Sequence, residues 1–180
     1  MIDEKEFIKQ LLTPETQNAA FQKLLSDYQR PLYSHIRNIV LNHDDADDVL
    51  QNTFVKVFQN LKNFKGESKL FSWMYRIATN EALTFLSQKA KLSGISSEDL
   101  QNKTIDGLKA DLYFDGDEIQ IKLQKAIVTL PEKQQLVFKM KYFEELKYEE
   151  IADILGTSVG ALKASYHHAV KKIELYVTSN

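Results

Sequence analysis

The chain has 180 residues, of which 43% are hydrophobic and 27% are charged, with a formal net charge of −2. It contains no cysteine, which excludes disulfides and thiolate metal sites. No apolar run approaches the roughly 20 residues of a membrane span, and the charged start lacks the layout of a signal peptide. We therefore expect a cytoplasmic protein without membrane insertion.

Apolar residues recur at helical spacing through the first half of the chain. Helices are expected over residues 3–12, from Pro14, from Pro31, over about 46–61 and over about 69–89. Thr13-Pro14 is a helix start signal, because a capping hydroxyl precedes a proline with a preset φ. Residues 42–45 break the pattern and supply caps, and residues 63–68 form a polar loop around Gly66.

Residues 92–118 differ in character from the rest of the chain. They hold two basic and seven acidic residues, a formal charge of −5, and their periodicity is weak. Such a run is unexpected inside a compact domain, so we interpret it as an acidic linker with one short helix near residues 106–112. It separates an N-terminal domain, residues 1–91, from a C-terminal domain, residues 119–180.

The C-terminal domain is organised around residues 146–172, which predict two short helices joined by a tight turn. Ile151 and Ile154 form one apolar face, and Gly156 follows at a position that favours positive φ. Ser158 can then cap the second helix. This is the pattern of a helix-turn-helix, although an ordinary helical hairpin in a core is the alternative. The predicted fold is therefore all-α, with two small helical domains joined by an acidic linker.

Two clusters could carry chemistry. Asp44, Asp45 and Asp48 have the spacing of a magnesium-binding motif of prenyl-diphosphate enzymes, but no second acidic motif accompanies them, so helix capping is the preferred interpretation. His167 and His168 are adjacent on a helix and point about 100° apart, which does not suit one metal ion. We find no catalytic machinery and expect no cofactor.

Several motifs together resemble one known family. The C-terminal ones are LPEKQQ (130–135), YFEELKYEEIA (142–152) and VGALK (159–163). The N-terminal ones are residues 44–58, FKG (64–66) and WMYRIATN (73–80). In this order they resemble the two domains of bacterial extracytoplasmic-function (ECF) sigma factors of the sigma-70 family. The match covers nearly the whole chain.

The resemblance implies roles for the N-terminal domain, which in the family docks on the β′ clamp helices of core RNA polymerase and opens the minus-ten element. The positions that match the polymerase-facing helix are Asp47, Asp48, Gln51 and Phe54. Those implied in strand opening are Lys56, Lys62, Phe64, Lys65, Ser68, Arg76 and Asn80. Core packing explains Phe54 at least as well, Trp73 is expected in the core rather than as a stacking platform, and Arg76 could equally brace the fold. Asn80 offers a donor and an acceptor that can read a base edge.

In the family, the C-terminal domain reads the minus-thirty-five element with its recognition helix. Here that helix presents Ser158, Lys163, Ala164, Ser165, His167, His168, Lys171 and Lys172. Members commonly carry Arg at the positions of Ser165, His168 and Val170. Because each lost phosphate contact weakens binding and its salt dependence, we hypothesise modest affinity for free promoter DNA.

The linker is long enough to join two promoter elements. Its 27 residues reach at most about 90 Å and span about 30 Å as a flexible coil. The two elements lie roughly 50 Å apart. Asp111, Asp115, Asp117 and Glu118 could mimic nucleic acid in a polymerase channel, or the segment could be a solvated tether.

The expected function is therefore that of a non-catalytic promoter-specificity subunit. The alternative is a stand-alone helix-turn-helix regulator that binds operators without polymerase. Partners implied by the resemblance are core RNA polymerase, promoter DNA and an anti-sigma factor.

Overall fold

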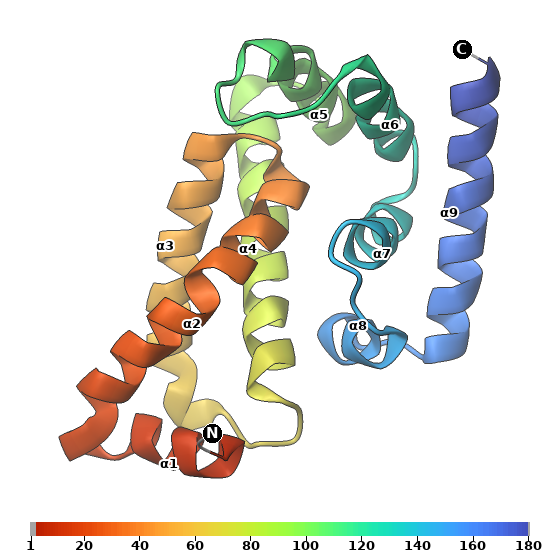
Figure 1. The fold of residues 1–180 in the computed structure, drawn as a ribbon. Helices are drawn as coiled ribbons and strands as arrows, with labels where there is room; N and C mark the ends of the chain where they lie inside the picture. Colours follow the sequence, from red (N-terminus) through yellow and green to blue (C-terminus); the bar gives the residue numbers. More distant parts are fainter. Residues whose placement is uncertain (1–2, 180) are drawn as a thin grey trace.

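The computed structural model describes residues 3–179, which form nine α-helices and two short 3₁₀ helices without any strand. Figure 1 shows their arrangement. The elements are α1 (Glu4–Leu12), α2 (Pro14–Val40), α3 (His43–Asn60), η1 (Leu61–Asn63), α4 (Leu70–Ser93), α5 (Ser97–Asp106), η2 (Leu108–Ala110), α6 (Glu118–Val128), α7 (Glu132–Tyr142), α8 (Tyr148–Leu155) and α9 (Val159–Ser179). The predicted all-α fold is confirmed. Across residues 3–179, no helix is long and apolar enough to cross a membrane.

Helices α2, α3 and α4 pack against one another in pairs, and α1 lies across one end of α2. The expected helix start at Pro31 is wrong, because α2 runs unbroken from Pro14 to Val40 with Pro31 inside it. An internal proline loses one backbone hydrogen bond and costs about 3 kcal/mol. Leu24, Leu32 and Ile36 are fully buried on both sides of it, and their packing offsets that cost.

Caps define the ends of these helices. Thr13 is extended and precedes Pro14 as predicted, but its hydroxyl donates back to the Lys9 carbonyl at 2.8 Å instead of capping α2. Asn42 caps α3, since its side-chain oxygen accepts from the Asp45 backbone N–H at 2.9 Å. Between them, Leu41 takes a left-handed conformation with φ of 64°, which turns the chain sharply from α2 into α3.

Residues 92–118 contain more helix than the one short helix expected in the acidic linker. Helix α4 continues to Ser93, and α5 begins after Ser96, whose hydroxyl accepts from the Asp99 N–H at 3.0 Å. The expected short helix near residues 106–112 is represented by η2. Residues 92–118, here called the connector, are mostly polar but contribute to a small apolar cluster. Buried Ile105 and Leu108 of the connector pack there with Leu41 and Val128.

The connector is also tied to the N-terminal domain by polar and aromatic contacts. An Arg37 guanidinium nitrogen lies 2.7 Å from an Asp111 carboxylate oxygen. The ring of Tyr113 stacks on that of His43 with centroids 3.7 Å apart. The segment therefore folds back onto α2 and the start of α3.

Helices α6–α9 form the C-terminal domain, and α8 and α9 make the helix-turn-helix. Ile151 and Ile154 are buried, as their spacing predicts. Gly156 has φ of 64°, and Ser158 caps α9 by accepting from the Ala161 N–H at 3.2 Å. All three details of the predicted turn are confirmed.

The two domains touch directly. Helix α8 packs against α4, and α7 packs against α2. Buried Val137, Met140 and Ile151 belong to the same apolar cluster as the core of the α2–α4 bundle. In Figure 1, α7 and α8 lie between α4 and α9, so α9 is on the side away from the N-terminal bundle.

Candidate nucleic-acid interface

The loop between α3 and α4 and the first turns of α4 enclose a small hollow. Its volume is about 320 Å³, and its wall combines aromatic, cationic and hydroxyl groups. The lining residues are Asn63, Phe64, Lys65, Glu67, Ser68, Trp73, Arg76 and Asp153. Gly66 has φ of 71°, a conformation that turns the loop around the hollow and that glycine adopts without strain.

Four of the seven residues expected at the minus-ten element meet in this hollow: Phe64, Lys65, Ser68 and Arg76. The rings of Phe64 and Trp73 lie 5.0 Å apart at 48°, so both aromatic faces contribute to one wall. Trp73 is half-buried: it packs against the core and also lines the hollow.

The other three expected residues lie outside the hollow. Lys56 is exposed on α3, and its ammonium pairs with the carboxylate of Glu81 on α4. Lys62 is exposed in η1, and Asn80 is exposed in the middle of α4. Arg76 donates from its Nη2 to the backbone carbonyl of Asp153 in α8. It therefore joins the N-terminal domain to the helix-turn-helix.

Sequence reasoning missed Asn63, Glu67 and Asp153 as members of this hollow. Asn63 and Glu67 flank the chosen loop residues, so contiguity alone could have found them. Asp153 lies 77 positions from Arg76 in the sequence, and no local pattern indicates that pairing.

The start of α3 carries the positions expected to face polymerase. Asp48 and Gln51 are exposed, Asp47 is half-buried with a carboxylate oxygen 3.4 Å from His43 Nε2, and Phe54 packs partly against the core. Carboxylates in the first turns also complement the helix macrodipole.

An apolar patch that sequence reasoning missed continues this face of α3. Val55 is 54% exposed and Phe58 is 44% exposed, and they follow Gln51 at four- and seven-residue steps. Periodicity could not separate them from the core, because Val57 between them is fully buried. The combined surface is acidic at one end and apolar at the other.

The recognition helix α9 buries Leu162, Ala169 and Ile173 on its inner face. Its outer face carries all the residues expected at the minus-thirty-five element. Ser158, Lys163, Ala164, His167, His168, Lys171 and Lys172 are exposed, and Ser165 is half-buried. The Lys163 ammonium lies 5.8 Å from the centroid of the Tyr148 ring, a cation–π distance that orients it along the helix.

The histidine pair shows no sign of forming a metal site. The rings of His167 and His168 are 6.1 Å apart and tilted by 57°. Within residues 3–179, no group of three or more His, Asp or Glu side chains is placed to hold a metal ion.

Comparisons with known proteins match both domains to one family. Residues 24–92 match the family described as Sigma-70 region 2, and residues 120–173 match Sigma-70, region 4. RNA polymerase sigma-H factor of Pseudomonas aeruginosa is 30% identical over 163 residues, which cover 86% of this chain and 84% of that protein. The chain belongs to the ECF sigma factors of the sigma-70 family.

Other relatives extend the comparison. The ECF sigma factor SigW of Bacillus subtilis is 28% identical over 156 residues, covering 82% of this chain and 83% of its own. Two solved structures share the fold: CnrH in complex with the cytosolic domain of CnrY, and the sigma factor RpoE of Bartonella quintana in complex with the anti-sigma factor NepR. The first has a TM-score of 0.68 at 19% identity over 98% of both chains. The second has 0.63 at 18% identity, over 88% of this chain and 96% of that one.

As a sigma factor, the protein binds core RNA polymerase and directs promoter recognition and transcription initiation. A stand-alone helix-turn-helix regulator is not favoured, because the region 2 match covers the N-terminal domain that such a regulator would not need.

Proposed function

We propose that this ECF sigma factor opens the minus-ten element at the hollow beside Phe64, reads the minus-thirty-five element with α9, and docks on polymerase through α3. The observation that carries the proposal is the convergence of Phe64, Lys65, Ser68 and Arg76 around one cavity. Aromatic and cationic groups together are what an unstacked base and its phosphates require.

The hollow suits a base that has left the duplex. Phe64 and Trp73 offer ring faces for stacking, which contributes about 1–3 kcal/mol per base. This is comparable to the few kcal/mol needed to extrude a base. Lys65 in the wall of the hollow and exposed Lys62 in η1 neutralise phosphates, while Lys56 first has to leave Glu81. Asn80 reads the edge of a base further along α4.

The recognition helix supplies a smaller positive charge than the family pattern provides. Lys163, Lys171 and Lys172 contact phosphates, while Ser165 and His168 occupy positions where the family commonly has Arg. With so few cations the isolated protein binds promoter duplex weakly, and its specificity depends on the polymerase complex.

The α3 surface fits a partner with basic and apolar side chains, which in the family is the β′ clamp helices. Asp47 and Asp48 pair with basic groups, and Gln51, Phe54, Val55 and Phe58 supply the adjoining contacts. Exposed apolar residues grouped with charges are typical of protein interfaces.

The protein acts in the cytoplasm. It needs no cofactor and no catalysis of its own, because the binding energy of the exposed strand offsets the cost of opening the duplex. An anti-sigma factor is a further expected partner. The structural neighbour RpoE is bound to the anti-sigma factor NepR.

Run-off transcription tests this proposal. Core polymerase is assayed on a promoter library with and without the protein, and discrete transcripts are expected only when both are present. Phe64→Ala should abolish the transcripts while leaving polymerase association intact, because Phe64 lies in the loop after η1 and is not part of the α3 surface. Transcripts that are unchanged by Phe64→Ala would contradict the minus-ten assignment. Pull-down on core polymerase separates that failure from a failure of docking.

A further inference from the structure

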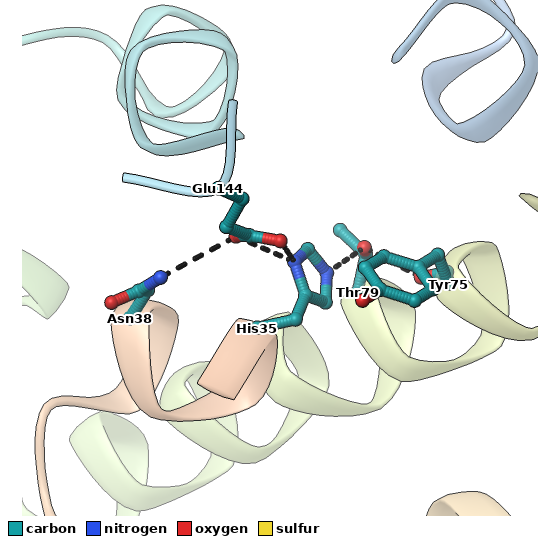
Figure 2. A network of polar contacts seen from close by, with 5 residues as sticks. All are labelled: His35, Asn38, Tyr75, Thr79 and Glu144. Carbon is teal, nitrogen blue, oxygen red and sulfur yellow. Dashed lines mark hydrogen bonds and ion pairs between the residues drawn. The ribbon is translucent and has the colours of Figure 1, made fainter. Parts of the chain in front are cut away.

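A buried polar contact fastens the C-terminal domain onto the N-terminal domain. Glu144, in the turn between α7 and α8, points its carboxylate at His35 of α2, with its two oxygens 2.9 and 3.0 Å from the ring Nδ1. Asn38, one turn further along α2, donates to the same carboxylate at 3.5 Å. Figure 2 shows the carboxylate between these two side chains. His35 is fully buried, and the Glu144 side chain is 9% exposed.

The hydrogen bonds define the charge of the His35 ring. Thr79 Oγ1 donates its only proton to the Tyr75 carbonyl at 2.7 Å, so it must accept from His35 Nε2, which lies 2.7 Å away. Nδ1 faces a carboxylate and therefore donates as well. With both ring nitrogens donating, these hydrogen bonds assign His35 as an imidazolium paired with the Glu144 carboxylate.

The charge of Glu144 also acts on two other titratable side chains, Tyr75 and Lys139. Burial, and after it Glu144, Tyr28 and Glu150, raises the pKa of Tyr75, which keeps that phenol uncharged. Burial lowers the pKa of Lys139 on α7 to about 8, and the charge of Glu144 opposes this shift. Glu144 therefore acts on two buried cationic side chains, one from each domain.

We propose that the His35–Glu144 pair is a latch that holds the free protein closed, with the C-terminal domain docked on α2 and α4. A buried ion pair contributes little net stability, but removing one partner is costly because the other charge stays buried and unpaired. The pair therefore specifies how the domains dock. Glu144 matches neither of the DNA-binding surfaces nor the α3 surface, so those functions do not account for it.

The closed form conflicts with simultaneous contact to both promoter elements. Helix α8 lies directly on α4, and Asp153 of α8 forms part of the wall of the minus-ten hollow through its bond with Arg76. Two elements roughly 50 Å apart require the domains to separate. This consequence rests on the proposed function, whereas closure itself does not, and it can be measured without polymerase or DNA.

The absence of cysteine allows a direct test in the full-length chain. Gln59→Cys on α3 and Glu174→Cys on α9 are both at exposed positions, so they carry a donor and an acceptor dye for single-molecule energy transfer. We expect one high-transfer population in the otherwise native chain. Glu144→Gln should increase the low-transfer, open fraction at least about tenfold.

Glu145→Gln is the matched control, because Glu145 is the exposed neighbour and its change removes the same charge. It should leave the distribution unchanged. Far-UV circular dichroism verifies that each variant keeps its helices. The pair His35→Met with Glu144→Leu should be more closed than Glu144→Leu alone, since it removes the buried imidazolium that the loss of Glu144 leaves unpaired. An unchanged distribution in Glu144→Gln, or equal opening in Glu145→Gln, would overturn the proposal. Neither result would bear on the proposed function, which the run-off assay tests separately.

Discussion

Burial of a charged side chain lowers the stability of a fold, and Lys139 is the clearest case here. Its side chain is 4% exposed, and burial lowers its pKa from 10.5 to about 8. The unfolded chain therefore holds this proton more tightly than the folded chain, so Lys139 destabilises the fold at neutral pH. The cost is full below about pH 8 and disappears as pH rises towards 10.5.

Lys139→Met should consequently raise the free energy of unfolding at pH 7 by about 1–3 kcal/mol. The gain should shrink as pH approaches 10.5, where the unfolded lysine is also neutral. Urea unfolding at pH 7 and at pH 10 measures both values. Lys133→Met, at an exposed position of the same helix, should change stability little. A loss of stability in Lys139→Met at pH 7 would contradict this account.

Gly156 has a conformational role at the turn of the helix-turn-helix. Its φ is 64°, and a β-carbon built there would meet no atom within 4 Å. Gly156→Ala should therefore cost only backbone strain, about 1 kcal/mol, with no steric clash. Thermal unfolding checks the size of the loss. Gly160→Ala, also in open space but at ordinary helical φ, should be neutral or stabilising. Equal effects of the two changes would argue against the strain explanation.

At the scale of secondary-structure elements, local signals predicted most helices and failed where tertiary packing decides. Proline at position 31 indicates a helix start, yet α2 continues through it because apolar residues on both sides bury the same face. Helix α5 was concealed by its polar composition, since only Leu100 and Ile105 of its ten residues are buried. Ile105 packs with Leu41 and Val128 from distant parts of the chain, and Leu100 joins the core of the α2–α4 bundle.

The connector should therefore behave as a docked element whose attachment depends on Arg37. Arg37 and Asp111 are both largely buried at 2.7 Å. Burial alone would raise the pKa of Asp111, but the Tyr113 backbone N–H and the Arg37 guanidinium outweigh this and lower it. Arg37→Gln should accelerate cleavage by a Glu/Asp-specific protease at residues 111–118 several-fold. Arg30→Gln, at an exposed position on the same helix, is the control. The contribution of this ion pair is present above the unfolded pKa of Asp111 and is lost as pH falls through the lower folded value.

The recognition helix gives a second prediction at this scale. Each phosphate contact contributes about 0.9 to the slope of log affinity against log salt. Lys171→Gln with Lys172→Gln should reduce this slope by about 1–2 for the polymerase–sigma complex on promoter DNA. Lys133→Gln, outside α9, should leave it unchanged. A slope that is unaffected by the α9 changes would remove those lysines from the interface.

For the whole molecule, the sequence predicted which surfaces exist and could not predict how they face one another. The family resemblance implied that Asp48 and Lys171 lie on two functional surfaces, and both side chains are exposed. The His35–Glu144 contact joins residues 109 positions apart, and Arg76–Asp153 joins residues 77 apart. Such pairs are determined by domain packing, which leaves no local periodicity. The closed arrangement is therefore a finding of the structure alone.

Footprinting of the promoter complex tests the central claim most directly, namely that one chain holds two separated promoter elements for polymerase. With core polymerase and the protein together, we expect protection of two patches about one and a half helical turns apart. Thymines should become reactive to permanganate only in the downstream patch. Protection of a single palindromic site by the protein without polymerase, or unpaired thymines with Phe64→Ala equal to those of the native chain, would contradict the account.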